Sequence, residues 1–265
     1  MSQNVRVEIK DNIAFVTIDR AESYNTFNTA VFQDVAAAVT ECGQNSAVSV
    51  VVLTGAGKAF SAGGDIAEFH RCIQAGTYMG DDLIGSAGAM AAAVRKCPVP
   101  VIAMVNGSAA GAGCGLALAC DFRVMSSKAK LVTAFTDIAV SGDTCTLYFL
   151  GRMLGTSRMM GYAVCGDPIS ADEALSLGLA YAVASPDELL DTTMALARKL
   201  AKKPRGAVAQ QKKYINRFLY PEMENVIAFE RHSMTACSRL SDFTEAVEAF
   251  LEKRPPNFKN DMLVD

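Results

Sequence analysis

Residues 99–121 read VPVIAMVNGSAAGAGCGLALACD, and this stretch decides the fold. It begins as an apolar, β-branched run, passes through Asn106-Gly107 into a glycine-rich turn, and ends in a short apolar segment. This pattern predicts a buried strand, a tight turn and a buried helix. The small residues let a ligand approach the main chain, and the first N–H groups of a helix lack partners within it. Because these groups also carry the positive end of the helix dipole, the stretch predicts a site for a negatively charged oxygen.

A second stretch, residues 50–66, has the same design. Its β-branched run ends at Thr54, residues 55–57 (GAG) turn the chain, and residues 59–66 (AFSAGGDI) lead into another helix. Two amide donors, one from each stretch, could hold a single oxyanion, which is the central hypothesis from the sequence. The alternative is that the glycines only allow close packing of a helix on a strand.

Composition favours a large domain whose main partner is neither nucleic acid nor a membrane. The chain has 265 residues, 51% of them hydrophobic, a net charge of -3 and no long basic run. No apolar run of membrane-spanning length is free of glycine turns. Eight scattered cysteines without a CxxC pair favour buried thiols in a reducing compartment, so we expect a cytoplasmic protein, with an organelle matrix as the alternative. With only two histidines, His70 and His232, we expect no metal site.

Alternating strands and helices precede a purely helical end. Strands are predicted at residues 5–10 and 13–18, joined by a two-residue hairpin turn at Asp11-Asn12, and at 49–54, 99–105, 122–125 and 179–184. Helices are predicted from an N-cap at Asn28 to about residue 42, from 66 into a loop, and at 83–97, 147–153, 189–202, 206–218, 221–237 and 241–252. The alternation predicts an α/β core with mainly parallel strands over residues 1–203, followed by a helical C-terminal region over residues 204–265. The polar residues 71–82 are either a mobile wall beside the site or a plain surface loop.

The two glycine-rich stretches resemble the oxyanion motifs of the crotonase, or enoyl-CoA hydratase/isomerase, superfamily. The resemblance runs from residue 5 to residue 258 and includes RAESYNTFN (20–28), similar to the family's CoA-channel segment, and the closing motif AFLEKRPPNF (249–258). It implies a spiral of ββα units with a helical C-terminal region for trimerisation, assembled as a homotrimer or a dimer of trimers. It also implies an enzyme that acts on acyl-CoA thioesters and needs no cofactor, because the substrate carries the coenzyme A.

The family motifs also assign candidate site residues. The oxyanion donors would be the backbone N–H groups of Gly64 and Ala112, and alanine at the second position keeps the donor because the donor is main chain. The residues implied to line the CoA channel are Tyr24, Thr26, Ala62, Asp65 and Ile66. The other implied substrate-binding residues are Ala110, Gly111, Gly115, Phe135 and Gly142.

The acid–base group departs from the usual pattern. Hydratases of this family typically carry two glutamates, at positions that match Gly115 and Phe135, and neither position holds a carboxylate here. Since water addition needs both deprotonation and reprotonation, this argues against two-glutamate hydration. We predict Asp143 as the acid–base group, because relatives with an aspartate at this point include single-acid enoyl-CoA isomerases. The alternative for Asp143 is an N-cap of the following helix, and Asp137 and Glu68 are reserve candidates.

The turn at residues 142–144 (GDT) also resembles that of the 4-chlorobenzoyl-CoA dehalogenases, whose aspartate is a nucleophile. Their tryptophan matches Phe135 and their histidine matches Gly88, so dehalogenation is not expected. The leading prediction is a shift of an enoyl-CoA double bond through an enolate, because one carboxylate can accept and return the same proton. Alternatives are hydration, thioester hydrolysis, and acyl-CoA binding by a catalytically degenerate subunit.

Overall fold

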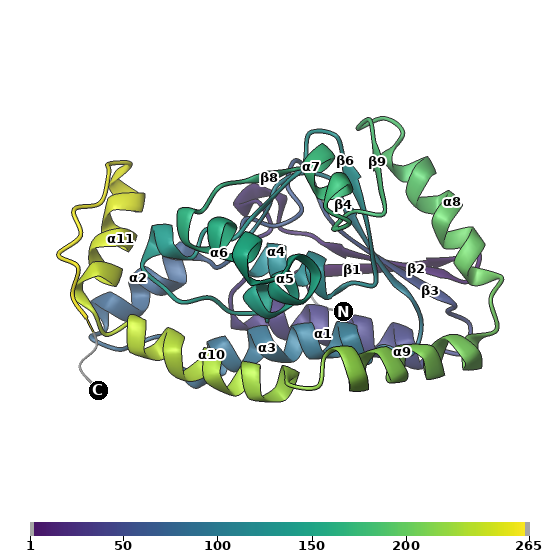
Figure 1. Ribbon diagram of the computed structural model, residues 1–265, viewed down its shortest axis with the longest axis horizontal. Coiled ribbons are helices and arrows are strands. Elements are labelled where there is room, and N and C mark those ends of the chain that lie inside the picture. The colour runs from purple at the N-terminus through teal and green to yellow at the C-terminus, as the bar shows by residue number, and fades with distance from the viewer. Residues whose placement is uncertain (1–2, 263–265) are drawn as a thin grey trace.

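The computed structural model describes residues 3–262 (Figure 1), so residues 1–2 and 263–265 of the two predicted regions lie outside it. Within this range the largest sheet has the strand order β1-β2-β3-β4-β6-β9. Its strands are β1 (Val5–Lys10), β2 (Ile13–Ile18), β3 (Val50–Gly55), β4 (Val101–Val105), β6 (Phe122–Ser126) and β9 (Ala182–Ala184). Only the β1–β2 pair among these is antiparallel. The predicted α/β fold with mainly parallel strands is therefore confirmed.

Local signals near the N-terminus hold as predicted. Asp11 and Asn12 adopt φ values of 52° and 62°, the left-handed conformation that a two-residue hairpin turn requires. Asn28 caps helix α1 (Thr29–Gln44), because its side-chain oxygen accepts the amide of Val31 at 3.0 Å. The turn and the cap each depend on main-chain geometry within three residues, so the sequence alone is enough to predict them.

A second, smaller sheet was not predicted. Its strands β5 (Ala109–Ala110), β7 (Lys130–Val132) and β8 (Ile169–Ser170) lie in the order β5-β7-β8. Strand β5 lies between β4 and helix α4 (Ala112–Ala119), where the sequence predicted a single turn. Two-residue strands carry no readable periodicity, and β5 exists because it pairs in parallel with β7.

Helices cover both faces of the large sheet. The helices before residue 204, besides α1 and α4, are α2 (Ile66–Gln74), α3 (Asp81–Lys96), α5 (Thr146–Leu154), α6 (Thr156–Cys165), α7 (Ala171–Ser176) and α8 (Leu189–Ala201). Helix α8 packs Leu189 and Leu196 onto one face, against Val50, Val52 and Ile102, while α1, α3 and α4 share the larger core on the other face. Helix α6 was not predicted from the sequence. The polar loop proves shorter than residues 71–82, because α2 continues to Gln74 and α3 already begins at Asp81.

The C-terminal end is helical, as predicted: α9 (Arg205–Leu219), α10 (Met223–Cys237) and α11 (Ser241–Glu252). Helices α9 and α10 follow one another along α3, and α11 packs against α2 (Figure 1). Several large apolar side chains on α9 and α10 are exposed, among them Tyr214, Phe218, Leu219 and Phe229. Among residues 3–262, no helix combines the length and apolarity needed to cross a membrane.

Candidate active site

The two glycine-rich turns lie directly against each other. Ser61 and Ala109 form a parallel bridge in which the Ala110 amide donates to the Ser61 carbonyl at 2.9 Å. Gly63 has φ of +91°, and a Cβ added to it would lie 2.8 Å from the Ala110 carbonyl oxygen and 3.6 Å from Gly111 Cα. Only glycine fits at this junction, so close main-chain packing and a bare approach to the backbone occur at the same place.

The Gly64 amide faces away from the segment that pairs with it. Gly64 forms a parallel bridge with Phe27, in which the Phe27 amide donates to Gly63 O at 2.8 Å and the Asp65 amide donates to Phe27 O at 2.9 Å. In a parallel pair, the residue between two such bonds directs its own N–H to the opposite side. Among the described residues the Gly64 amide has no acceptor.

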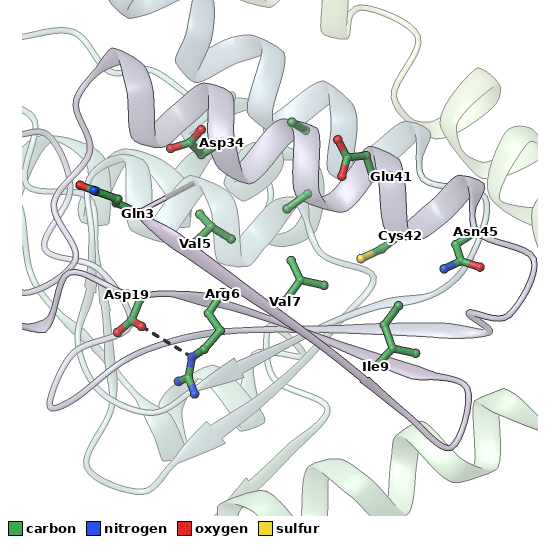
Figure 2. Close-up of a pocket in the computed structure, with 12 residues that line it drawn as sticks. Gln3, Val5, Arg6, Val7, Ile9, Asp19, Asp34, Glu41, Cys42 and Asn45 are labelled. Atoms are coloured by element: carbon green, nitrogen blue, oxygen red, sulfur yellow. Dashed lines mark ion pairs between the residues drawn. The ribbon is translucent and has the colours of Figure 1, made fainter. Parts of the chain in front are cut away.

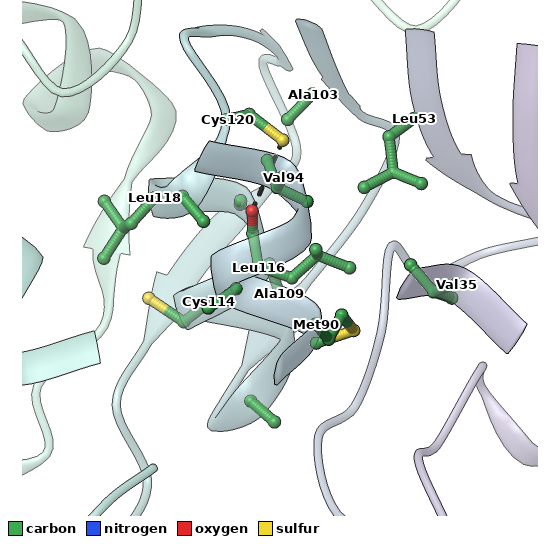
Figure 3. Packing of buried hydrophobic residues seen from close by; sticks show 14 of the residues in the cluster. Val35, Leu53, Met90, Val94, Ala103, Ala109, Cys114, Leu116, Leu118 and Cys120 are labelled. Atoms are coloured by element: carbon green, nitrogen blue, oxygen red, sulfur yellow. Dashed lines mark hydrogen bonds between the residues drawn. The ribbon is translucent and has the colours of Figure 1, made fainter. Parts of the chain in front are cut away.

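Ala112 begins helix α4, and its amide likewise has no acceptor within residues 3–262. Helix α4 is buried along its whole length, with side chains such as Cys114 and Leu116 in the core (Figure 3). The free amide therefore lies at the positive end of a helix shielded from water, where its attraction for an anion is strongest. If the glycines served only to let a helix pack closely on a strand, the amides of Gly64 and Ala112 would still lack a hydrogen-bond partner among the described residues.

Arg123 stabilises the opposite end of α4, a role that sequence reasoning missed. Its buried guanidinium donates to the carbonyls of Ala117 at 3.2 Å, Leu118 at 3.3 Å and Cys120 at 2.7 Å. Burial lowers the pKa of Arg123. A cation at a helix C-terminus satisfies the last carbonyls and offsets their negative end of the dipole. The short helix is thereby fixed at the end far from the candidate site.

The predicted CoA-channel residues lie together beside the first turn. The Ala62 amide donates to Tyr24 O at 3.0 Å, and the bridge between Phe27 and Gly64 extends this pairing. Asp65 caps α2, which begins at Ile66, and its carboxylate lies 3.5 Å from the Arg20 guanidinium. The Thr26 hydroxyl oxygen is buried, with no hydrogen-bond partner among the described residues.

Two polar residues that sequence reasoning missed hold this region in shape. Asn25 is buried with φ of 59°, and its side-chain amide donates to the carbonyls of Ala56 at 2.9 Å and Ala59 at 2.8 Å. The Ser61 hydroxyl donates to Asn25 O at 2.8 Å and accepts the Gly63 amide at 3.1 Å. The only available signal was the tolerance of asparagine for left-handed backbone, which does not reveal distant partners.

Asp143 and Gly64 line one narrow cavity. The other residues that line it are Phe27, Phe32, Phe69, Met79, Leu83, Ile84 and Met234. Among the described side chains, the walls are therefore apolar apart from the Asp143 carboxyl group. Burial raises the pKa of Asp143 to about 6, while a hydrogen bond from the Thr144 hydroxyl at 2.9 Å acts in the opposite direction. Ala112 is not among these lining residues, and its link to the cavity runs through the contact between Gly111 and Gly63.

The turn that carries Asp143 has strained backbone. Gly142 has φ of +114°, and the next two residues after Asp143, Thr144 and Cys145, have φ of 57° and 56°. Left-handed backbone is costly for a β-branched residue such as threonine, and such strain gathers at functional sites. The alternative role of Asp143 as an N-cap is wrong, because Cys145 occupies the cap of α5 and no side chain caps it. Asp143 contributes its main-chain carbonyl instead, which accepts the Thr146 amide at 3.0 Å.

The positions of the family's two glutamates are filled by other groups. A Cβ added to Gly115 would collide with the Thr146 hydroxyl and lie 2.7 Å from Thr144 Cβ. Phe135 is buried, and its ring lies 3.3 Å from where a Gly142 Cβ would stand. A Cβ on Gly88 would lie 2.5 Å from Ile227 Cγ2, so a histidine does not fit there either. The absence of these groups is thus built into the packing.

The reserve candidates lie elsewhere. Asp137 is exposed in the 3-10 helix Thr136–Ile138, and Glu68 forms an ion pair with Arg71 on α2. Neither of them lines the cavity that contains Asp143. Both therefore lie outside the cavity that the acid–base prediction concerns.

Larger hollows lie away from this site. One of them, a groove of about 820 Å³, lies between β1 and α1 and is lined by residues such as Val5, Val7 and Cys42 (Figure 2). None of the predicted site residues lines it. The described part of the chain contains no group of three or more His, Cys, Asp or Glu side chains placed to hold a metal ion.

Asp143 and Gly64 line one cavity, and the Ala112 amide follows the turn that contacts Gly63. A buried carboxyl group and two unpartnered amides are groups that can support proton transfer beside a developing oxyanion. The chain belongs to the enoyl-CoA hydratase/isomerase family, whose family model matches residues 8–261. It is therefore an enzyme of this family with the crotonase fold, and the alternative of a binding-only subunit is set aside.

Relatives along nearly the whole chain carry different activities in their names. A probable enoyl-CoA hydratase from Rhodobacter capsulatus is 34% identical, with 96% of this chain and 97% of the relative covered. The 1,2-epoxyphenylacetyl-CoA isomerase of Escherichia coli is 32% identical, with 97% and 99% covered. The crystal structure of an enoyl-CoA hydratase from Mycobacterium avium subsp. paratuberculosis matches with a TM-score of 0.86 at 29% identity, covering 94% of this chain and 99% of that one.

Proposed function

We propose that this enzyme shifts the double bond of an enoyl-CoA thioester through an enolate intermediate. The amides of Gly64 and Ala112 donate to the thioester oxygen as it becomes anionic, in a site from which packed side chains exclude water. Asp143 removes a proton from one carbon of the acyl chain and returns it two carbons away. One carboxylate suffices because the same proton is accepted and given back.

The observation that carries this proposal is that Asp143 is the single carboxyl group among the described side chains lining the cavity. The two positions where family hydratases typically carry glutamates hold Gly115 and Phe135, and packing around Gly115 leaves no room for a larger side chain. With a pKa of about 6, Asp143 is ionised at neutral pH and can act as a base, yet its conjugate acid is strong enough to give the proton back. We therefore expect kcat/KM to fall as the pH drops below about 6.

Substrate binding and assembly complete the proposal. We assign the coenzyme A portion to the channel of Tyr24, Thr26, Ala62, Asp65 and Ile66, and the acyl portion to the surroundings of Ala110, Gly111, Gly115, Phe135 and Gly142. We propose a homotrimer or a dimer of trimers, in which the exposed aromatic residues of α9 and α10 become buried between subunits. A cytoplasmic location stays a prediction from composition.

Incubation with a 3-enoyl-CoA and, separately, with crotonyl-CoA tests the reaction by absorbance and product mass. We expect the 3-enoyl thioester to become the conjugated 2-enoyl isomer with unchanged mass. The Asp143→Asn variant should lose turnover by ~10²- to 10⁴-fold, the usual range for a general acid–base group, while it still binds acyl-CoA. An Asp143→Asn enzyme with an unchanged rate would remove Asp143 from the mechanism.

Hydration is the second candidate, because relatives at 34% and 32% identity are named as enoyl-CoA hydratases. It would require a water held by a group other than the two usual glutamates. A gain of 18 mass units on crotonyl-CoA identifies it, and any exchange of the α-protons with deuterated water reports an enolate whose proton escapes to solvent. A protein that binds acyl-CoA esters but neither isomerises nor hydrates them contradicts both candidates.

A further inference from the structure

Helix α10 holds the turn that carries Asp143 through three consecutive contacts on one face. The Glu230 carboxyl group accepts the Cys145 amide at 3.0 Å, the Ser141 hydroxyl donates to the Ser233 hydroxyl at 2.9 Å, and the Met234 sulfur accepts the Gly142 amide at 3.3 Å. Glu230, Ser233 and Met234 have the i, i+3, i+4 spacing of one helix face. Thus both sides of the strained turn are fixed by a segment that lies far along the chain.

Glu230 is an unusual member of this face. It is 9% exposed, and among the described residues it has no ion-pair partner. The neighbouring Arg231 lies instead beside Gly85, where an added Cβ would be 3.6 Å from Arg231 Nε. A buried carboxyl group without a cation is costly, so its retention next to another buried carboxyl group calls for a specific role.

We propose that Glu230 is a positioning residue for the reaction: by accepting the Cys145 amide, it holds the left-handed turn that presents the Asp143 carboxyl group to the cavity. The inference rests on the proposed function, in which Asp143 moves the proton. Thr144 and Cys145 each adopt the left-handed conformation that L-residues with a side chain rarely adopt, so the turn needs outside contacts to persist. Glu230 does not line the cavity and acts through the turn, not on the substrate.

The electrostatics agree with this geometry. Burial and the nearby Asp143 carboxylate raise the pKa of Glu230 to about 8, and the hydrogen bond from the Cys145 amide acts in the opposite direction. The thiol of Cys145 is the other titratable group of the turn, and burial, Glu230 and Asp143 together raise its pKa. At neutral pH Glu230 is therefore protonated, and its carbonyl oxygen can still accept the amide, as a glutamine side chain could.

A pair of substitutions at Glu230 separates the hydrogen bond from simple space filling. Glu230→Gln keeps an acceptor of the same shape and should retain most of kcat. Glu230→Leu fills a similar volume but offers no acceptor, and kcat should fall by ~10- to 100-fold with little change in KM, as expected for a misplaced catalytic group. Ser233→Ala is the matched control on the same helix face and should lose less. Wild-type kcat in Glu230→Leu, or equal losses in both Glu230 variants, would overturn the proposal.

A second measurement is independent of turnover. Carboxyl-labelled protein followed by ¹³C NMR titration reports the ionisation of Glu230 in the wild type and in Asp143→Asn. Removal of the neighbouring charge should lower the pKa of Glu230, and an unchanged titration would show that the two groups do not face each other, which overturns the inference. If Asp143→Asn keeps full turnover, the proposed function fails instead, so the two failures are distinguishable.

Discussion

The two halves of the candidate site are built in different ways. The amide half consists of two main-chain turns that meet where Gly63 touches Ala110 and Gly111. The acid half is one side chain, Asp143, on a turn held by a helix 85 residues farther along the chain, through Glu230 and the Cys145 amide. Local backbone geometry therefore fixes the candidate donors, whereas long-range contacts position the proposed proton-transfer group. Substitutions that affect one half only should separate them.

Gly63→Ala should produce the largest effect, because it strikes the junction of the two main-chain turns. The new Cβ would lie 2.8 Å from the Ala110 carbonyl oxygen, on a residue with φ of +91°. Strain and overpacking together should lower the free energy of unfolding by about 2–4 kcal/mol, and displacement of the Gly64 amide should remove most of the turnover. Denaturant unfolding and the isomerase assay measure both quantities.

Gly178→Ala is the matched control for this substitution. Gly178 also has positive φ, +75°, but an added Cβ would meet nothing within 4 Å, and the residue lies outside the site. The free energy of unfolding should therefore fall only by the backbone cost of about 1–2 kcal/mol, and kcat should not change. If Gly63→Ala were no worse than Gly178→Ala, the contact between the two turns would not matter to the site.

Asp143→Asn should have the opposite effect on stability, because it removes a buried charge from the acid half. Burial raises the pKa of Asp143 from 3.8 to about 6 in the folded state, so folding favours the protonated form. The contribution of the protonated Asp143 to the stability of the folded wild type is present below pH 4 and is lost as the pH rises through 6. At pH 7 the free energy of unfolding of the variant should therefore exceed that of the wild type by up to about 3 kcal/mol, while turnover is lost.

The pH dependence checks this prediction. Unfolding curves at pH 4 and pH 7 should show the gain of Asp143→Asn shrinking toward zero at the lower pH, because both proteins are then neutral at this position. A variant that is equally stable or less stable than the wild type at pH 7 would mean that Asp143 is not ionised in a dry environment. Stability and activity are thus expected to conflict at this one residue.

The same contrast explains how much could be predicted from the sequence. The hairpin turn at Asp11 and Asn12 and the cap at Asn28 follow from rules that span two or three residues. The glycine-rich turns were found because their small residues are local signals as well. The candidate donors and Asp143 could be named because the family motifs match at these positions, and their assignment as donors and acid stays a prediction.

The supporting residues could not be predicted because their partners are distant in the chain. Glu230 reads as one more acidic residue on an amphipathic helix, and only the fold brings it to Cys145. Arg123 reads as a strand residue, although its guanidinium holds the end of α4. Strand β5 was not predicted for the same reason, since its pairing with β7 leaves no periodic pattern in the sequence. Hydrophobic periodicity indicates which face is buried, but not which polar group meets it there.

Thr26→Val should have the smallest effect and would sharpen the assignment of the CoA channel. The Thr26 hydroxyl oxygen is buried and has no hydrogen-bond partner within residues 3–262, and valine has nearly the same shape. Removal of an unsatisfied hydroxyl should therefore raise the free energy of unfolding by about 1 kcal/mol. If the hydroxyl meets the acyl-CoA, the lost hydrogen bond should raise KM by roughly 2- to 10-fold with kcat nearly unchanged.

Thr40→Val provides the control, because the Thr40 hydroxyl donates to the Ala36 carbonyl at 2.7 Å on the exposed side of α1. Stability there should change by less than about 0.5 kcal/mol and KM should not move. A rise in KM for Thr26→Val alone places the hydroxyl in contact with substrate. A gain in stability without a change in KM would instead show that the unpartnered oxygen is a local packing compromise, and Thr26 would leave the set of channel residues.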